Sequence, residues 1–324
     1  MATKDAVLQA LQNSEGAFLS GEELSNKLSV SRTTVWKAIK ALREEGHPIE
    51  AVTNRGYMLM SDSWTITEDS LRACLPTRYK NLDLHIYDTI DSTNLKARQL
   101  AMDGAPHGTV VLAKQQTSGR GRLGRSFFSP REGIYLSIVI KPDFDVSKSV
   151  LVTSAAAVAV ANAIEKVCGL ESKIKWVNDV YIDGKKVCGI LTEAGADIES
   201  GQLEWLVVGI GLNLTATAED FPPELTAKAG SLYPGGPAPV SRAALAGAIG
   251  RELLALCPGF ACLDEYRARC FVPGHWVTVC TGTETYAAQA LSIDDAGRLV
   301  VQREGGRTEA LRCGEVTIRP TKTE

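Results

Sequence analysis

Three helical stretches and a hairpin fill residues 1 to about 60, and this order constrains the fold more than any other feature of the chain. In each stretch, apolar residues recur every three to four positions, which is the spacing of one helix face. The third stretch covers 31–45. Two short extended runs follow, 49–52 and 57–60, and Gly56 lies in the turn between them. Three helices followed by a hairpin predict a winged helix-turn-helix.

Positive charge is concentrated on the third helical stretch, which has four cations and no acid before Glu44. Charge alone favours a solvated helix face. The helix-turn-helix spacing and the wing favour contact with DNA instead. Because the formal net charge of the whole chain is -3, a DNA site has to be local. We expect DNA contacts from Ser31, Arg32, Thr33, Thr34, Lys37, Lys40 and, at the tip of the wing, Arg55.

The rest of the chain alternates strands with helices and then changes to short strands alone. Its length of 324 residues suits about two domains of roughly 150 residues each. Strands and helices alternate up to about residue 270, which predicts a mixed sheet covered by helices. Short strands between glycine turns follow Pro273-Gly274 and predict a small antiparallel barrel. The predicted fold class is α+β, with domains at 1–62, 63–270 and 271–324.

The predicted elements follow from these patterns. Central strands are expected at 82–87, 109–114, 134–140, 173–182, 186–193 and 203–214. Helices are expected near 92–103, 147–168 and 240–269. Strands of the C-terminal barrel are expected at 276–280, 286–293, 299–303, 309–312 and 315–319.

No segment of the sequence predicts secretion or a membrane span. The N-terminal segment carries Lys4, Asp5 and Glu15 without an apolar block, unlike a signal peptide. The most apolar run, 151–164, has 14 residues, whereas a membrane span needs about 20. The eight cysteines form no CxxC pair and no zinc-binding spacing, which favours reduced thiols. We therefore expect a cytoplasmic protein without membrane contact.

The strongest local signal is the segment 119–125, Gly-Arg-Gly-Arg-Leu-Gly-Arg. Its glycines let the backbone approach an anion closely and its guanidinium groups neutralise the charge, so phosphate or pyrophosphate is the expected ligand. The segment also matches the GxGxxG pattern of dinucleotide-binding folds, in which the glycines open a helix. Here the strand 134–140 comes next, and no helix is predicted between. A flexible basic surface loop remains a second interpretation.

Two further segments carry polar residues suited to a ligand. A hairpin is predicted at 173–191 because Asp183-Gly184 is a strong turn signal between two strands. Lys186 on this hairpin could neutralise a phosphate and Asp179 could hold Mg²⁺ or a sugar hydroxyl, although a lysine beside a turn is often solvated. The segment 91–95, Asp-Ser-Thr-Asn-Leu, fits a helix cap whose side chains can also bond a small polar ligand.

Other chemistries find no motif in this sequence. The patterns GxSxG, HExxH and GxxxxGK[ST] do not occur, and the four histidines are scattered along the chain. A hydrolytic triad or a metalloenzyme is therefore not expected.

Together with Val207 to Leu214, these motifs resemble those of biotin protein ligases, in the same order and over essentially the whole chain. With its winged helix, the chain is similar to the bifunctional biotin ligases and biotin-operon repressors of bacteria. This resemblance implies a DNA-binding winged helix, a central mixed sheet like that of class II tRNA synthetases, and a C-terminal SH3-like barrel.

The resemblance also implies roles for individual residues. Catalysis is assigned to Lys186, Arg120 and Arg122. Biotin contacts are assigned to Ser92, Thr93, Asn94, Gln116, Gly119, Arg120, Lys186 and Gly189. Contacts to ATP and the adenylate are assigned to Arg122, Phe127, Asn178, Asp179, Asn213 and Arg319, with Mg²⁺ at Asp179.

The sequence departs from the family pattern at two positions. Phe127 stands where the family usually has tryptophan, so the aromatic face is kept and the indole donor is lost. Val177 replaces the proline of Lys-Trp-Pro-Asn-Asp. Neither change removes a charged group, so we expect the chain to be active.

For activity, the resemblance implies that biotin and ATP give biotinyl-5′-AMP, whose biotin passes to a lysine of a biotin carboxyl carrier protein. It further implies biotin-responsive repression, with a homodimer of the adenylate-bound chain on a two-fold operator. Three alternatives remain open: a ligase whose winged helix has lost DNA binding, a regulator that only senses biotin, and a lipoate-type acyl-adenylate ligase.

Overall fold

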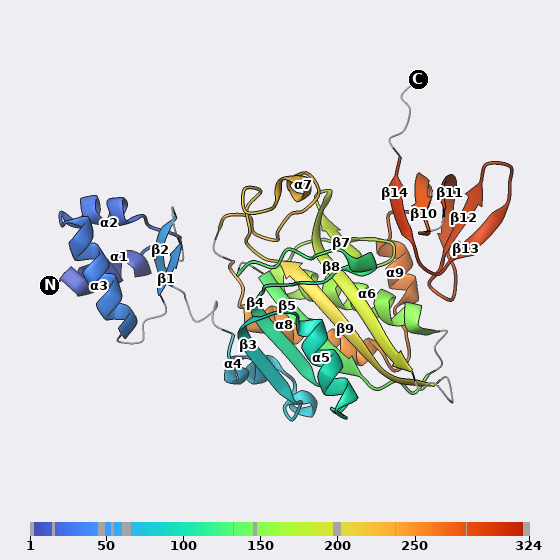
Figure 1. The fold of residues 1–324 in the computed structure, drawn as a ribbon, viewed down its shortest axis with the longest axis horizontal. Coiled ribbons are helices and arrows are strands. Elements are labelled where there is room, and N and C mark those ends of the chain that lie inside the picture. Colours follow the sequence, from blue (N-terminus) through green and yellow to red (C-terminus); the bar gives the residue numbers. More distant parts are fainter. Residues whose placement is uncertain are drawn as a thin grey trace, which may run out of the picture.

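The computed structural model describes residues 3–14, 17–44, 49–52, 55–59, 66–131, 133–144, 148–196, 202–236, 238–282 and 284–319. An N-terminal helical unit, a central sheet with helices on both faces, and a C-terminal sheet follow one another along the chain (Figure 1). The predicted α+β class is confirmed. The predicted domain boundaries after residues 62 and 270 stay predictions, and the first lies outside the described residues.

The N-terminal unit has the predicted three helices and wing. Its elements are α1 (Thr3–Gln12), α2 (Gly21–Leu28), α3 (Arg32–Glu44), and the antiparallel pair β1 (Ile49–Val52) and β2 (Gly56–Leu59). Ser20 caps α2 in a capping box with Glu23, because each side chain bonds the backbone N–H of the other. The helices bury Val7, Leu11, Leu24, Val35 and Leu42 in a core of their own.

The central domain is built on a seven-stranded mixed sheet. Its strands are β3 (Leu84–Ile90), β4 (Val110–Gln116), β5 (Gly133–Ile140), β6 (Lys173–Lys175), β7 (Asp179–Ile182), β8 (Lys185–Ala196) and β9 (Leu203–Asn213). Their order is β3-β4-β5-β9-β8-β7-β6. Strands β3 and β4 run parallel and every other neighbouring pair is antiparallel. The predicted mixed sheet is confirmed.

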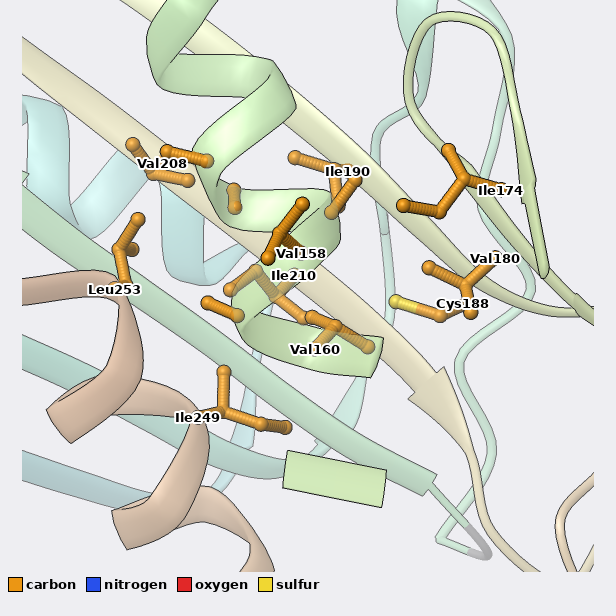
Figure 2. Close-up of a cluster of buried hydrophobic side chains, with 14 of the residues drawn as sticks. Val158, Val160, Ile174, Val180, Cys188, Ile190, Val208, Ile210, Ile249 and Leu253 are labelled. Atoms are coloured by element: carbon orange, nitrogen blue, oxygen red, sulfur yellow. The ribbon is translucent and has the colours of Figure 1, made fainter. Parts of the chain in front are cut away.

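Helices cover both faces of this sheet (Figure 1). Helix α5 (Thr93–Met102) lies on one face against β4, β5 and β9, while α6 (Ser149–Cys168) and α8 (Arg242–Leu256) lie on the other. Shorter helices are α4 (Glu68–Cys74), α7 (Pro223–Thr226), α9 (Leu263–Arg269), η2 (Thr77–Tyr79) and η3 (Arg122–Gly124). Figure 2 shows the buried aliphatic layer between α6, α8 and the sheet, including Val158, Ile190, Ile210 and Leu253.

The apolar stretch of helix α6 is longer than the 14-residue run, 151–164, noted in the sequence. Over Val150–Cys168, 19 residues, it is long and apolar enough to cross a membrane by length and composition. Its residues 155 to 161 are fully buried, and it packs against α8 and β8. Burial inside the fold explains its apolar character, because the core helix of a domain is apolar on all sides.

Several element boundaries differ from the sequence prediction. The single strand expected at 173–182 is two strands, β6 and β7, separated at residues 176–178. The single helix expected at 240–269 is α8 and α9, because the chain turns at Pro258-Gly259. Helices α4 and α7 were missing from the prediction, since both are too short to show a periodic pattern.

The C-terminal domain is a five-stranded antiparallel sheet. Its strands are β10 (Trp276–Cys280), β11 (Thr285–Ile293), β12 (Leu299–Arg303), β13 (Thr308–Leu311) and β14 (Glu315–Ile318), in the order β13-β12-β11-β10-β14. In the described part of the chain β13 and β14 form the two edges and do not pair. The predicted barrel is thus present as its five antiparallel strands. Hydrogen bonds from Trp176 Nε1 to Gly297 O (3.1 Å) and from Arg267 Nε to Ile293 O (2.9 Å) attach this sheet to the central domain.

Candidate active site

A cavity of about 510 Å³ lies where the segment 119–125, called here the arginine loop, meets the β7–β8 hairpin, β9 and β14. All four motifs singled out in the sequence therefore converge there, together with the C-terminal domain. Of the residues assigned to biotin, ATP or catalysis, the cavity is lined by Ser92, Thr93, Asn94, Gln116, Arg120, Arg122, Phe127, Asn178, Asp179, Lys186, Gly189 and Asn213. This convergence disfavours the interpretation of 119–125 as a basic surface loop.

A buried polar network forms one end of the cavity. Ser92 caps α5, and the next residue, Thr93, donates from its backbone N and its Oγ1 to Gln116 Oε1, at 2.8 and 3.0 Å. Ser137 Oγ bonds both Thr93 Oγ1 (2.8 Å) and Asn94 Oδ1 (2.7 Å). Each side chain is thereby fixed by its neighbours, so the network can bind a small polar group without rearranging.

Glycines on β8 and β9 let a large ring lie over the strands. A Cβ atom on Gly211 would come 2.5 Å from the ring of Phe127, and one on Gly189 would come 3.0 Å from it. The Phe127 ring also meets Tyr135 edge to face at a centroid distance of 6.5 Å. Phe127 is therefore held as an aromatic wall of the cavity, and its assigned adenylate contact stays a prediction.

The arginine loop is tied to three different elements. Arg122 donates to Asn178 Oδ1 (3.0 Å) and to Gly314 O (3.2 Å) of the C-terminal domain. Arg125 makes a bidentate ion pair with Glu315, with one bond of 2.9 Å. Arg120 approaches Glu193 of β8 at 3.7 Å. These contacts place three guanidinium groups around one cavity, as anion binding requires.

The β7–β8 hairpin supplies the fourth cation. Its turn residues Asp183 and Gly184 both have positive φ, 48° and 73°, as a tight hairpin turn requires. Beyond the turn, Lys186 Nζ lies 2.7 Å from Asp179 Oδ1 across the hairpin. Burial lowers the pKa of the Lys175 ammonium and raises the pKa of the nearby Tyr181 hydroxyl to about 12. The Lys175 ammonium therefore lies in a partly desolvated part of the site, where charge acts strongly on a bound anion.

Two assigned residues do not line the cavity. Gly119 packs against the backbone of residue 127, just after the arginine loop, where a Cβ would come 2.3 Å from Phe127 O. The lack of a side chain at Gly119 therefore lets the two ends of the loop lie side by side. Arg319 follows β14 and bonds Thr278 Oγ1 at 3.0 Å on the C-terminal sheet. Their assigned contacts stay predictions.

Sequence reasoning missed residues that only the fold brings to the site. These residues are Arg125, Glu193, Gly209, Gly211, Gly314 and Glu315. Arg125 and the two β9 glycines lay inside motifs already noted, so a signal existed for them. Gly314 and Glu315 carried none, because the C-terminal domain reaches the site only through tertiary packing.

The assigned DNA-facing residues lie at the surface of the N-terminal unit. Ser31, Arg32, Thr33, Lys37 and Lys40 are exposed, and the Lys40 ammonium lies 5.8 Å from the exposed Trp36 ring. Arg32 pairs with Glu22 of α2. The apolar stripe of α3 faces the core, so its polar face is available to a partner.

Arg55 lies in the turn between β1 and β2, as expected, and its side chain is directed toward the central domain. Its guanidinium lies over the Phe18 ring at 4.6 Å and 3.8 Å from Asp220 of the central domain. The two preceding turn residues, 53 and 54, are outside the described residues. The assignment of Arg55 to DNA therefore stays a prediction.

Comparison with known families gives two matches. Residues 86–213 match the biotin/lipoate A/B protein ligase family, and residues 3–58 match a helix-turn-helix domain family. The first match covers the polar network, the arginine loop and the β7–β8 hairpin. The second covers the three helices and the wing.

Individual proteins extend the match over almost the whole chain. A "Bifunctional ligase/repressor BirA" of Bacillus spizizenii is 36% identical over 313 residues, covering 93% of this chain and 94% of the relative. A "Biotin--[acetyl-CoA-carboxylase] ligase" of Mycobacterium tuberculosis is 34% identical over 69% of this chain and 85% of the relative. The structure of a biotin protein ligase from Aquifex aeolicus in complex with biotin and ATP, 25% identical, superposes with a TM-score of 0.60, covering 74% of this chain and 99% of that one. The chain therefore belongs to the family of bifunctional biotin ligase/repressor proteins.

Proposed function

We propose that this chain joins biotin to ATP to form biotinyl-5′-AMP and then transfers biotin to a lysine of a biotin carboxyl carrier protein. One observation carries this proposal: a single cavity combines a buried polar network with Arg120, Arg122 and Lys186. The network suits the small polar ring of biotin, and the cations suit its carboxylate and the phosphates of ATP.

Charge neutralisation and positioning account for both steps. Attack of a carboxylate on the α-phosphate of ATP brings two anions together, so the reaction needs fixed cations around the reacting groups. Arg120, Arg122 and Lys186 supply them, and Phe127 provides a wall against which the adenylate can lie. Neither step requires a covalent enzyme nucleophile. Closure of the site around the mixed anhydride would protect it from water until the carrier lysine arrives.

Asp179 fits the role of a single protein ligand to Mg²⁺. Among the described residues no group of three or more His, Cys, Asp or Glu side chains could hold a metal ion by itself. Mg²⁺ in phosphoryl-transfer sites takes one or two carboxylates plus substrate phosphates, so one carboxylate suffices. Asp179 Oδ1 is buried and lies 2.7 Å from Lys186 Nζ, and both residues line the cavity. When bound, the ion neutralises phosphate charge.

For the N-terminal unit we propose operator binding by a homodimer of the adenylate-bound chain. The exposed polar face of α3 suits the major groove, and a two-fold operator requires two such helices. The relatives named as ligase/repressors support this assignment. Because ATP, the carrier protein and the operator are all found in the cytoplasm of bacteria, we infer that the chain acts there.

The test is the exchange of radioactive pyrophosphate into ATP, with biotin or lipoate as the acid. Exchange with biotin and none with lipoate is the expected result. Exchange with lipoate alone would assign the chain to the lipoate branch of the matched family. Transfer is then followed by a streptavidin blot of a biotin carboxyl carrier protein after reaction. If biotin supports exchange but the carrier protein is not labelled, the chain is instead a regulator that only senses biotin.

A further inference from the structure

Glu193 is an acidic residue at a site built to bind anions. It lies on β8, its side chain is 21% exposed, and it does not itself line the cavity. A carboxylate close to bound phosphates repels them, so its presence lowers affinity unless the residue serves another purpose. Its two oxygens point to two different partners, and both of these partners line the cavity.

The first oxygen is fixed by Asn94. Glu193 Oε2 accepts a hydrogen bond of 2.8 Å from Asn94 Nδ2. Asn94 is buried, and its Nδ2 also contacts Leu191 O at 3.3 Å while its Oδ1 accepts from Ser137. Gly209 makes room for this amide, since a Cβ there would come 1.9 Å from Asn94 Oδ1. Asn94 therefore cannot turn, and it sets the orientation of the Glu193 carboxylate.

The second oxygen faces Arg120. The distance from Arg120 Nη1 to Glu193 Oε1 is 3.7 Å, and the arginine side chain is 42% exposed. Among the described residues, Glu193 is the only acidic side chain that forms an ion pair with Arg120. A long arginine side chain with one partner samples many rotamers when that partner is removed, and ordering it then reduces the affinity for substrate.

Resting on the proposed function, we propose that Glu193 is a positioning residue that joins the biotin end of the site to the arginine loop. Its carboxylate transmits the fixed orientation of Asn94 to Arg120 and holds the guanidinium at the cavity before substrate arrives. Substrate then meets a cation that is already ordered. Preorganisation of this kind appears mainly in the KM for biotin, because the guanidinium is held equally in the ground state and the transition state.

The decisive variant is Glu193→Gln, which keeps an oxygen for Asn94 and removes the charge that attracts Arg120. We expect the KM for biotin in pyrophosphate exchange to rise about tenfold, with kcat changed less than about threefold. Glu193→Asp, which keeps the charge on a shorter arm, should recover part of the loss. Glu204→Gln on the exposed side of neighbouring β9 is the matched control and should behave as the wild type.

A double-mutant cycle with Arg120→Ala separates positioning from a structural role. If Glu193 acts through Arg120, Glu193→Gln should cause no further loss in the Arg120→Ala background. A rise in KM below about threefold, or losses that multiply in the double variant, would overturn the proposal. Thermal unfolding of each variant checks that the fold is intact. Failure of the proposed function itself would be distinct, because the wild-type chain would then show no biotin-dependent exchange.

Discussion

At the scale of single residues, the shape of the site depends on glycines, which have no side chain, as much as on the side chains that line it. Gly209 and Gly211 face Asn94 and Phe127, and a Cβ at either position would lie 1.9 or 2.5 Å from an atom of that partner. Both distances are shorter than any real Cβ contact, so the partner would have to move. The two glycines of β9 therefore set where the polar network and the aromatic wall lie.

Gly211→Ala should weaken ATP more than biotin. The new methyl group would displace the Phe127 ring, so we expect the KM for ATP to rise about tenfold while the KM for biotin changes less than about threefold. Steady-state adenylation kinetics measure both. Gly236→Ala is the control, because no atom lies within 4 Å of a Cβ there. Equal losses for both substrates would show that the ring does not contact the nucleotide alone.

Lys186→Ala should slow adenylation at least about tenfold, because it removes one fixed cation from the site of charge development. Biotin-dependent pyrophosphate exchange measures this step. Lys148→Ala removes a lysine that does not line the cavity and serves as the control. An unchanged exchange rate for Lys186→Ala would refute the role of this ammonium.

At the scale of elements, the arginine loop and β14 are held together across two domains. Arg125 and Glu315 form a bidentate ion pair, and the hydrogen bonds from Arg125 lower the pKa of the Glu315 carboxyl from its ordinary value of 4.5. A carboxyl whose pKa is lowered by folding stabilises the fold above its unfolded pKa, and this contribution is lost as the pH falls through the lowered value.

Glu315→Gln should therefore destabilise the protein at neutral pH and not in acid. Because the pair is partly exposed, we expect a loss below about 1 kcal/mol in the free energy of unfolding at pH 7. The difference from the wild type should shrink as the pH falls below the ordinary pKa of 4.5 and through the lowered pKa of Glu315. Urea unfolding across this pH range measures it. A difference that stays constant from pH 7 to pH 3 would mean that the ion pair contributes nothing.

At the scale of the whole molecule, a DNA-binding unit and an enzyme share one chain. The contact of Arg55 with Asp220 connects the wing to a segment whose next residue, Phe221, lines the cavity. Phe221 meets Phe128 of the loop region edge to face at 6.0 Å. The N-terminal unit thus contacts the central domain within one residue of the site.

Occupancy of the site should control assembly. Ordering of the arginine loop by the adenylate is expected to favour the dimer, so biotin plus ATP should shift the chain from monomer to dimer. Sedimentation velocity with and without the two substrates measures this shift. The same assembly state under both conditions would contradict the linkage.

DNA binding should depend on the cations of α3 in a salt-dependent manner. Lys37→Ala is expected to weaken binding to operator and random DNA alike and to lower the salt slope by about 1, if this lysine contacts phosphate. Fluorescence anisotropy at several salt concentrations gives the slope, with Lys27→Ala on α2 for comparison. An unchanged slope would remove Lys37 from the interface, and no DNA binding by the dimer would favour a ligase without repressor activity.

The sequence by itself determined the features that depend on local chemistry. Periodic apolar residues predicted the three helices and the wing, Asp183-Gly184 predicted the hairpin that carries Lys186, and the glycine-arginine segment predicted a loop that lines the cavity. Each depends on neighbours within a few residues, so propensity and spacing suffice to predict it. Twelve residues assigned through the family resemblance line one cavity.

Only the tertiary structure decided which distant groups complete the site. Glu193 meets Asn94 across 99 residues of sequence, and Glu315 meets Arg125 across 190. Tertiary packing also places the guanidinium of Arg55, on the wing, 3.8 Å from Asp220 of the central domain. No local pattern encodes such pairs, because they arise only when strands, loops and a second sheet are packed together. Local chemistry thus specified the groups that would bind, and packing decided which groups hold them in place.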